Sequence, residues 1–575
     1  MTDLALPARP YSEDDPAECR IAYFSMEVGI DERLPIYSGG LGVLAGDTLR
    51  SFADLRFRAV GVSLLYSKGY FRQILDTAGN QTEEPVAWRP PEVVRELAAR
   101  VTVTIERRAV GIRAWQYDIT GLTGHVVPLL LLDTNLEENR PDDREITARL
   151  YGGDDRYRLC QEIVLGVGGI RMLRALGYKN IRRHHLNEGH ASFLALELLC
   201  ELPDPTAVAS DIHAVRRACV FTTHTPVPAG HDQFDWGLVQ EVLGEPIPAA
   251  ELRMLGGQDR LNMTHLALNL SGHVNGVAKK HGEVSQRMFP GYAVDSITNG
   301  VHAATWVCPS VRLLFDRHIP GWASDPFSLR NAIKIPLEDL HEAHLEAKWR
   351  LVREVRQRIG LELSSNAFTI GFARRATAYK RPDLLLQDPE RLAAISRDAG
   401  RIQIVYAGKA HPHDEPGKEL IRRIHAMAER LRGDVTIVYL PDYSMEIARF
   451  LTAGVDVWLN TPLRPREASG TSGMKAALNG VPSLSILDGW WIEGHVEGIT
   501  GWSIGDDESD ETADSDAVAA RDASELYVKL ESVLLPLYRE NPARWAQVGQ
   551  RTIAINGSFF HTHRMVQQYA ANAYI

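Results

Sequence analysis

The sequence is poor in cysteine and has no long apolar run. Its five cysteines are scattered over 575 residues without a C-x-x-C pair, and the odd, dispersed set argues against a disulfide framework. No uninterrupted apolar segment approaches the roughly 18 residues that a membrane helix needs, and the first residues lack the pattern of a signal peptide. The sequence therefore predicts a cytoplasmic protein with reduced thiols and no membrane partner.

Positive charge is also scarce. The chain has 63 Lys and Arg against 74 Asp and Glu, a net charge of −11, which gives no general reason to bind nucleic acid. Any phosphate must then be held by a local cluster of basic residues. Internal repeats are absent from the sequence, and the acidic stretch at residues 506–516 is expected to be a solvated loop without an assigned function.

What is present is an alternation of strand-like apolar runs and helical patterns, which predicts an α/β fold with largely parallel sheets. A long, polar-faced helix is expected at residues 340–359, with a domain boundary near residues 305–330. Ligands of such sheets bind at the carboxyl ends of the strands, where three of the motifs below fall. Short buried strands are expected at residues 368–372, 402–406, 435–439, 455–459 and 483–487.

The most informative motif is EASGTSGMKAALNG at residues 467–480. It places Lys475 one turn inside a helix whose entrance is rich in glycine and hydroxyl groups. Free N–H groups and the helix dipole make such an entrance a phosphate site, and Gly470 and Gly473 allow close backbone approach. A lysine beside a phosphate site suggests covalently held pyridoxal phosphate. The spacing alone is equally compatible with an ordinary helix start, capped by Ser469 or Thr471, in which Lys475 is a solvated charge.

Two further motifs offer phosphate donors. Gly39 and Gly40 precede a helical pattern and form a second anion-binding turn, although a glycine loop alone is as compatible with tight packing. The glycines of residues 164–169 lie in an apolar helical run and are interpreted as packing. The loop at residues 372–382 has three strong donors suited to two adjacent phosphates, or is simply a solvated basic loop. These donors are Arg374, Arg375 and Lys380.

Together these motifs resemble the α-glucan (glycogen, starch and maltodextrin) phosphorylases, in particular their short bacterial and archaeal branch. The resemblance implies two Rossmann-like domains facing a central cleft, the GT-B type of glycosyltransferase fold. Residues 1–305 would form an N-terminal α/β domain with the glycine loop over the substrate phosphate and with glucan-site residues. Residues 306–575 would form the domain that carries the cofactor lysine, with the last helix crossing back to the N-terminal domain.

The implied reaction is reversible phosphorolysis of the non-reducing end of an α-1,4-glucan by inorganic phosphate. It gives α-D-glucose 1-phosphate with retention, and the phosphate of pyridoxal 5'-phosphate acts as the acid/base partner of inorganic phosphate. The alternative is a sugar-nucleotide-dependent glucan synthase of the same fold, which would use the same loops without needing a lysine at position 475. A catalytically silent glucan-binding protein would keep the fold but lose Lys475 or the basic loop.

The resemblance also implies roles for individual residues. His224 and Asn299 match residues that hold the glucose 6-hydroxyl, and Arg374 stands where the family has lysine, so its hydrogen-bond geometry differs. The residues with implied catalytic roles are Lys475, Arg375, Lys380 and His224. Those implied to bind the cofactor are Lys475, Arg374, Thr471, Ser472, Gly473, Tyr443 and His190. Those implied to bind substrate are Gly39, Gly40, Asn299, Glu467, Ser469, Gly470 and Tyr379.

Other expectations concern metals, regulation and assembly. The histidine pairs at residues 184–185, 411–413 and 561–563 lack the spacing of a zinc site, so no metal is expected. The chain begins almost at the catalytic core, so the N-terminal phosphorylation and nucleotide-control elements of animal enzymes are expected to be absent. The segment DGWWIE at residues 488–493 departs from animal and plant enzymes and puts acceptor-site details in doubt. Homodimers are common in the family, but the sequence leaves the oligomeric state open.

Overall fold

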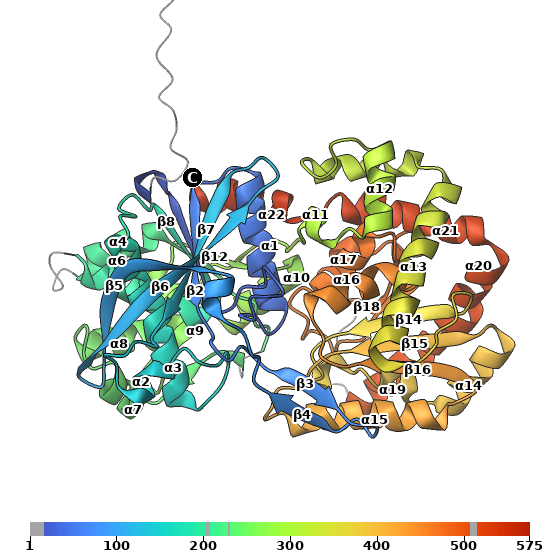
Figure 1. Ribbon diagram of the computed structural model, residues 1–575, viewed down its shortest axis with the longest axis horizontal. Coiled ribbons are helices and arrows are strands. Elements are labelled where there is room, and N and C mark those ends of the chain that lie inside the picture. Colours follow the sequence, from blue (N-terminus) through green and yellow to red (C-terminus); the bar gives the residue numbers. More distant parts are fainter. Residues whose placement is uncertain (1–15, 203–207, 228–229, 506–514) are drawn as a thin grey trace, which may run out of the picture.

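Two β-sheets dominate the molecule, one in each half of Figure 1. The computed structural model describes residues 16–202, 208–227, 230–505 and 515–575. The expected solvated loop at residues 506–516 lies almost entirely outside the described residues. Both sheets are mainly or wholly parallel and are flanked by helices, which confirms the α/β prediction.

The first sheet has nine strands in the order β13-β12-β9-β8-β1-β2-β7-β6-β5. The seven strands from β13 to β7 run parallel, and β6 and β5 add an antiparallel edge. The strands are β1 (Ile21–Ser25), β2 (Ala59–Leu64), β5 (Arg95–Ile105), β6 (Arg108–Thr120), β7 (Val126–Asp133), β8 (Arg183–Asn187), β9 (Cys219–Thr222), β12 (His273–Gly276) and β13 (Asp295–Ser296).

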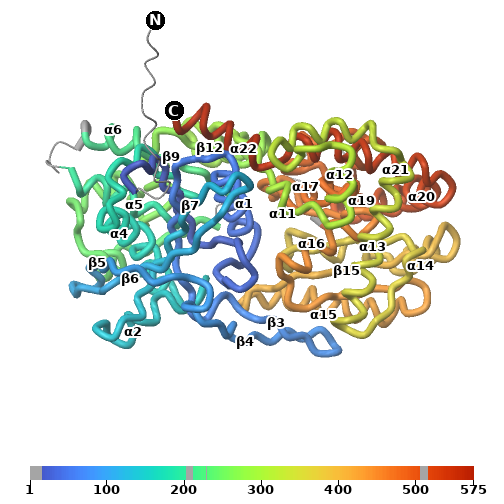
Figure 2. The backbone as a smooth tube through the Cα atoms, turned by 45° about the horizontal axis from the view of Figure 1, so that its top comes forward, coloured from blue at the N-terminus to red at the C-terminus, as the bar shows by residue number. Residues whose placement is uncertain are grey.

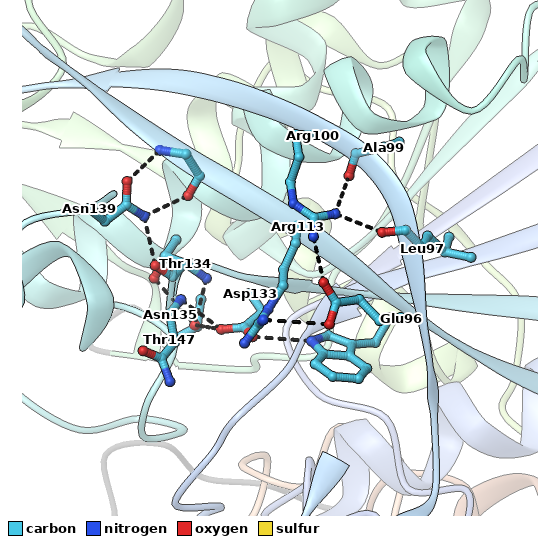
Figure 3. A network of polar contacts seen from close by, with 12 residues as sticks. Glu96, Leu97, Ala99, Arg100, Arg113, Asp133, Thr134, Asn135, Asn139 and Thr147 are labelled. Atoms are coloured by element: carbon cyan, nitrogen blue, oxygen red, sulfur yellow. Dashed lines mark hydrogen bonds and ion pairs between the residues drawn. The ribbon is translucent and has the colours of Figure 1, made fainter. Parts of the chain in front are cut away.

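The antiparallel edge is closed by local polar contacts. Glu106 and Arg107 both have positive φ, as the tight two-residue turn between β5 and β6 requires. Figure 3 shows the network beside this turn's strands, where Arg113 pairs with Asp133 at 2.7 Å and with Glu96 at 3.6 Å. These opposite charges pair with one another at the edge of the sheet.

The second sheet has six parallel strands in the order β16-β15-β14-β17-β18-β19. Most of their residues are buried, as expected for strands covered on both faces, and the five strands predicted from apolar runs are confirmed. The predicted long helix is confirmed as α13 (Leu337–Ile359). The strands are β14 (Phe368–Ala373), β15 (Ile402–Ala407), β16 (Val435–Leu440), β17 (Val457–Asn460), β18 (Ser483–Ile486) and β19 (Gly501–Ile504).

Helices pack against both sheets and against one another. The glycines at residues 164–169 lie in a buried helical run, where a Cβ on Gly166 would meet the backbone at 2.6 Å, so the packing interpretation is confirmed. No helix within the described ranges is long and apolar enough to cross a membrane. The main helices are α1 (Gly40–Asp54), α3 (Asp155–Ile163), α4 (Gly169–Ala175), α5 (Phe193–Cys200), α9 (Met263–Leu270), α10 (Lys279–Met288), α12 (Pro309–His318), α14 (Pro389–Asp398), α15 (Glu415–Arg430), α16 (Met445–Gly454), α17 (Thr471–Leu478), α19 (Ser515–Lys529) and α21 (Pro542–Thr552).

Two segments join the halves. The hairpin of β3 (Arg72–Leu75) and β4 (Gln81–Glu84) extends from the first half to the second and lies beside α15 (Figures 1 and 2). The C-terminal helix α22 (Thr562–Tyr569) returns to the first half, where it packs on α1. The carboxyl edges of both sheets are therefore held in a fixed relation.

Candidate functional site

Most of the predicted site residues follow the carboxyl ends of parallel strands. In the first sheet, His190, His224 and Asn299 follow β8, β9 and β13. In the second sheet, Arg374 and Arg375 follow β14, Tyr443 follows β16, and Glu467 follows β17. The two edges meet, because the Tyr37 hydroxyl in the first half accepts a hydrogen bond from the Met445 N–H in the second (3.0 Å). The motifs therefore lie where parallel sheets bind ligands.

Lys475 lies in the second turn of α17 and is only 6% exposed. The helix begins after Gly470, whose φ of +91° places it in the left-handed region that favours glycine. Burial lowers the pKa of Lys475 to about 8, and among the described residues no hydrogen bond or ion pair reaches its amine. A far larger fraction of this amine is therefore neutral near physiological pH than in a solvated lysine, which is the alternative interpretation.

The amine of Lys475 faces an aromatic ring instead. Its Nζ lies 3.6 Å from the ring centroid of Trp306, and the Trp306 indole N–H donates to the Asp47 carboxylate (2.7 Å). The same Asp47 oxygen accepts the His302 N–H (3.1 Å). Sequence reasoning missed Trp306 and Asp47, because they lie 169 and 428 positions before the lysine and no spacing pattern links them.

The basic loop forms a buried ion cluster with Glu467. Oε2 of Glu467 lies 2.6 Å from Arg374 Nη1 and 2.6 Å from Lys380 Nζ. Burial alone would raise the pKa of Glu467, but the two cations outweigh it and lower that pKa to about 2. Asp488, a residue outside the predicted set, accepts the Glu467 N–H (2.8 Å), and its own burial raises its pKa to about 7. Glu467 is thus charged at neutral pH, whereas Asp488 gains or loses its proton near pH 7.

Arg375 points toward the glycine loop. A Cβ on Gly39 would lie 3.7 Å from Arg375 Nη2, so the guanidinium and this loop are neighbours. The Arg375 side chain is exposed, and it forms no ion pair within the described part of the chain. The Ser38 and Gly39 N–H groups both donate to Glu27 (2.5 and 3.1 Å), which fixes the loop. The first-turn N–H groups of α1, from Gly40 onward, remain to meet an anion beside Arg375.

His224 and Asn299, the two residues expected to bind a sugar hydroxyl, are both buried or partly buried. Burial lowers the pKa of His224 to about 4, and its Nε2–H donates to Asn187 Oδ1 (2.7 Å), which leaves Nδ1 as a hydrogen-bond acceptor. The His224 backbone N–H donates to Glu188 (2.7 Å), a residue held at φ +77°. Asn299 is 3% exposed, and its side-chain oxygen has no partner among the described residues.

Several buried polar atoms near the motifs lack a hydrogen-bond partner in the described ranges. Buried polar atoms are nearly always paired, so a group of unpaired ones beside a strand edge indicates a ligand. Those that fall on or beside the predicted motifs are Asn299 Oδ1, Ser469 Oγ, Thr377 Oγ1, Asn460 Oδ1 and His190 Nδ1.

The remaining predicted residues fall into two groups. Ser472 accepts the Trp458 indole N–H (3.2 Å), and a Cβ on Gly473 would meet Trp490 at 2.8 Å, so both line the start of α17 together with Thr471. The other group lies at the basic loop. Tyr379 lies under the Lys380 amine (4.4 Å to the ring centroid), and Tyr443 is close enough to Arg374 to affect its pKa.

His190 contacts residues of the first half, and its expected place beside the cofactor stays a prediction. Its Nε2 contacts Asp232 (3.2 Å), and its ring lies beside Tyr151. The sequence could not show this, because the partners of a lone histidine depend on how distant strands are arranged.

His563, from one of the histidine pairs in which no zinc site is expected, lies in a cluster with His302 and Asp54. His302, His563 and Asp54 bring three potential metal-ligand atoms within 4.8 Å of one another. Both histidine Nε2 atoms contact the same Asp54 oxygen, at 2.7 and 3.0 Å. These are hydrogen-bond distances, so hydrogen bonds to Asp54 account for the cluster and hold the segments of His302 and His563 to α1.

Comparison with known proteins agrees with this arrangement. The sequence profile of the family described as carbohydrate phosphorylase matches residues 244–499. The chain is 40% identical to a maltodextrin phosphorylase from Thermococcus litoralis and 39% identical to a glycogen phosphorylase from Mycobacterium tuberculosis, each match covering 96% of this chain and 70% of the relative. A glycogen phosphorylase from Aquifex aeolicus is 38% identical, over 96% of this chain and 86% of the relative. The chain therefore belongs to the carbohydrate phosphorylase family.

Proposed function

We propose that the protein is an α-1,4-glucan phosphorylase, which transfers the terminal glucosyl unit of a glucan to inorganic phosphate. The observation that carries the proposal is the buried Lys475 amine, which has a lowered pKa and no polar partner among the described residues. The relatives named maltodextrin and glycogen phosphorylase support the same activity. A sugar-nucleotide synthase has no use for such a lysine, and no observation favours it.

The residues around Lys475 fit pyridoxal phosphate. A neutral amine is the form that attacks an aldehyde, and the start of α17 offers backbone N–H groups to a phosphate. When bound, pyridoxal phosphate supplies a phosphate that exchanges a proton with inorganic phosphate. The residues proposed to hold it are Lys475, Thr471, Ser472, Gly473, Arg374 and Tyr443.

Inorganic phosphate is proposed to bind between Arg375, Lys380 and the first turn of α1. Arg375 is unpaired within the described residues and faces the loop, so its guanidinium can meet a second dianion. Positive charge from these residues offsets the repulsion between two close phosphates, whose pKa values are raised by their proximity.

The sugar is proposed to lie against His224, Asn299, Ser469 and Gly470. Neutral His224 can accept a hydrogen bond from a sugar hydroxyl at Nδ1, and Asn299 offers a buried oxygen with no partner among the described residues. Inorganic phosphate gives its proton to the glycosidic oxygen as the C1–O bond breaks. A phosphate oxygen then bonds to C1 from the same face, so the α configuration is retained, without the pair of carboxylates of a hydrolase.

The test is an assay of the purified protein, supplied with pyridoxal phosphate, a maltodextrin and inorganic phosphate. The proposal expects glucose 1-phosphate as the product and no glucose, with the activity lost in Lys475→Ala. Release of free glucose, or glucan synthesis only from a nucleotide sugar, would contradict it. A cytoplasmic location and a homodimeric state remain predictions.

A further inference from the structure

The loop that carries Asn299 is held by the C-terminal segment of the chain. The Val301 N–H donates to the Phe560 carbonyl (3.1 Å), and the Thr562 N–H donates to the Val301 carbonyl (3.0 Å). These two bonds form a parallel bridge between Val301 and His561, which are 260 positions apart in the chain. Gly300 approaches so closely that a Cβ there would lie 2.3 Å from the His561 backbone. The loop and residues 560–562 are therefore packed backbone to backbone.

Arg564 adds a side-chain clamp to the same loop. Its Nη2 donates to the Asn299 carbonyl (2.8 Å), its Nη1 donates to the Thr298 carbonyl, and its Nε donates to the Phe559 carbonyl (3.0 Å). Its Nη1 also donates to Gln568 Oε1 (2.9 Å), and its guanidinium lies over the Phe559 ring (4.9 Å). The residue is 4% exposed, and it forms no ion pair with a described carboxylate, so burying its charge is costly. Two of its three guanidinium nitrogens are directed at the backbone of the Asn299 loop.

Residues next to Arg564 are held in place by helix α1. The Ser51 hydroxyl of α1 contacts the Thr562 hydroxyl (2.6 Å), and Asp54 of α1 holds His563 (3.0 Å). On the other side of the loop, Glu493 accepts the Thr298 hydroxyl (2.8 Å). The position of the Asn299 backbone is thus defined from both sides, while the Asn299 side-chain oxygen has no partner among the described residues.

We propose that Arg564 is a positioning residue, which sets the Asn299 side chain for a hydroxyl of the transferred glucosyl unit. This inference rests on the proposed function, because it assigns the unpaired Asn299 oxygen to the sugar. Arg564 touches no substrate itself. It acts through the Thr298 and Asn299 carbonyls, which belong to the two peptide groups on either side of the Asn299 Cα atom.

The test is a double-mutant cycle on kcat/KM for glucose 1-phosphate in the direction of glucan synthesis. Arg564→Met is expected to lower kcat/KM by roughly tenfold or more in the otherwise unchanged protein, since a displaced hydrogen-bonding group loses its transition-state contact. In the Asn299→Ala background the same substitution is expected to change kcat/KM by less than about threefold, because the group it positions is gone. Arg564→Lys, which keeps one charged donor, should lie between.

The matched control is Arg183→Met. Arg183 also ties the C-terminal segment to the first half through carbonyls, those of Ala573, Ile575 and Arg217, but it has no contact with the Asn299 loop. It should lower the thermal midpoint as Arg564→Met does while leaving kcat/KM unchanged.

Additive effects of Arg564→Met and Asn299→Ala on kcat/KM, or an equal loss of kcat/KM in Arg183→Met, would show that Arg564 only stabilises the fold. Either result would overturn the positioning role but leave the proposed function standing. An unmodified protein without activity on glucose 1-phosphate would overturn the proposed function, and the inference with it.

Discussion

At the scale of single residues, two neighbouring arginines have different environments. Arg374 pairs with buried Glu467 at 2.6 Å, whereas Arg375 is exposed beside the glycine loop and unpaired within the described residues. Arg375→Met is therefore expected to change the free energy of unfolding by less than about 0.5 kcal/mol but to lower kcat/KM for phosphate at least about 100-fold. Urea unfolding and phosphorolysis kinetics measure the two quantities.

Arg374→Met is the matched variant, because it leaves Glu467 with only Lys380. It should lower the free energy of unfolding by about 2 kcal/mol. Equal destabilisation by the two substitutions, or an unchanged phosphate dependence in Arg375→Met, would contradict this division of tasks.

Asp488 gives the site a pH dependence. Burial raises its pKa from 3.8 to about 7, so the folded protein keeps a proton that the unfolded chain loses in mild acid. The stability that this proton contributes is complete below about pH 4 and is lost as the pH rises toward 7, at up to about 1.4 kcal/mol per pH unit. Asp488→Asn cannot ionise, so its free energy of unfolding should fall less than that of the unmodified protein between pH 5 and pH 7. Parallel curves for the two proteins would refute the assignment.

At the scale of elements, α1 packs closely on the segment that follows β1 through Gly42 and Gly46. A Cβ on Gly42 would lie 2.7 Å from Glu27, and one on Gly46 would lie 1.9 Å from the Gly29 carbonyl oxygen. A Cβ on Gly40, in contrast, would meet nothing within 4 Å. Gly46→Ala should therefore lower the free energy of unfolding by about 3 kcal/mol, and Gly40→Ala should leave it unchanged or raise it by up to about 1 kcal/mol. Thermal unfolding of both variants checks this, and a fully stable Gly46→Ala would contradict the close packing.

Elements and residues that depend on local sequence patterns could be predicted from the sequence. The parallel strands and α13 follow from local apolar patterns, because strands covered on both faces must be apolar throughout. Lys475 and the basic loop were visible because each is a local motif. Trp306, Asp47 and Arg564 were missed, because their partners are brought near by long-range packing that leaves no spacing pattern in the chain.

At the scale of the whole molecule, the β3–β4 hairpin ties the halves together with buried amide groups. The Gln81 side chain donates to the Ala410 carbonyl (2.9 Å) and accepts the Ala410 N–H (3.1 Å). The Gln73 side chain likewise donates to the Gly408 carbonyl (3.0 Å) and accepts the Asp442 N–H (2.9 Å). These contacts hold the segment after β15, which lies next to the basic loop, since the Arg374 N–H donates to the Ala407 carbonyl.

Gln81→Ala should lower the free energy of unfolding by about 2 kcal/mol, because it leaves two buried backbone groups without partners. The control is Thr82→Ala on the exposed face of the same strand, which should change it by less than about 0.5 kcal/mol. Urea unfolding compares the two. Equal free energies of unfolding for the two variants would mean that the hairpin contacts the second half without stabilising it.

The central claim is that Lys475 holds pyridoxal phosphate at the junction of the two sheets. The most direct measurement is borohydride reduction of the purified protein after incubation with pyridoxal phosphate, followed by mass mapping of its peptides. The account predicts a pyridoxyl group on Lys475, absent in Lys475→Arg, and faster labelling as the pH rises through about 8, where the amine loses its proton. A folded protein that takes up no pyridoxyl group, or takes it up on another lysine, would contradict the account.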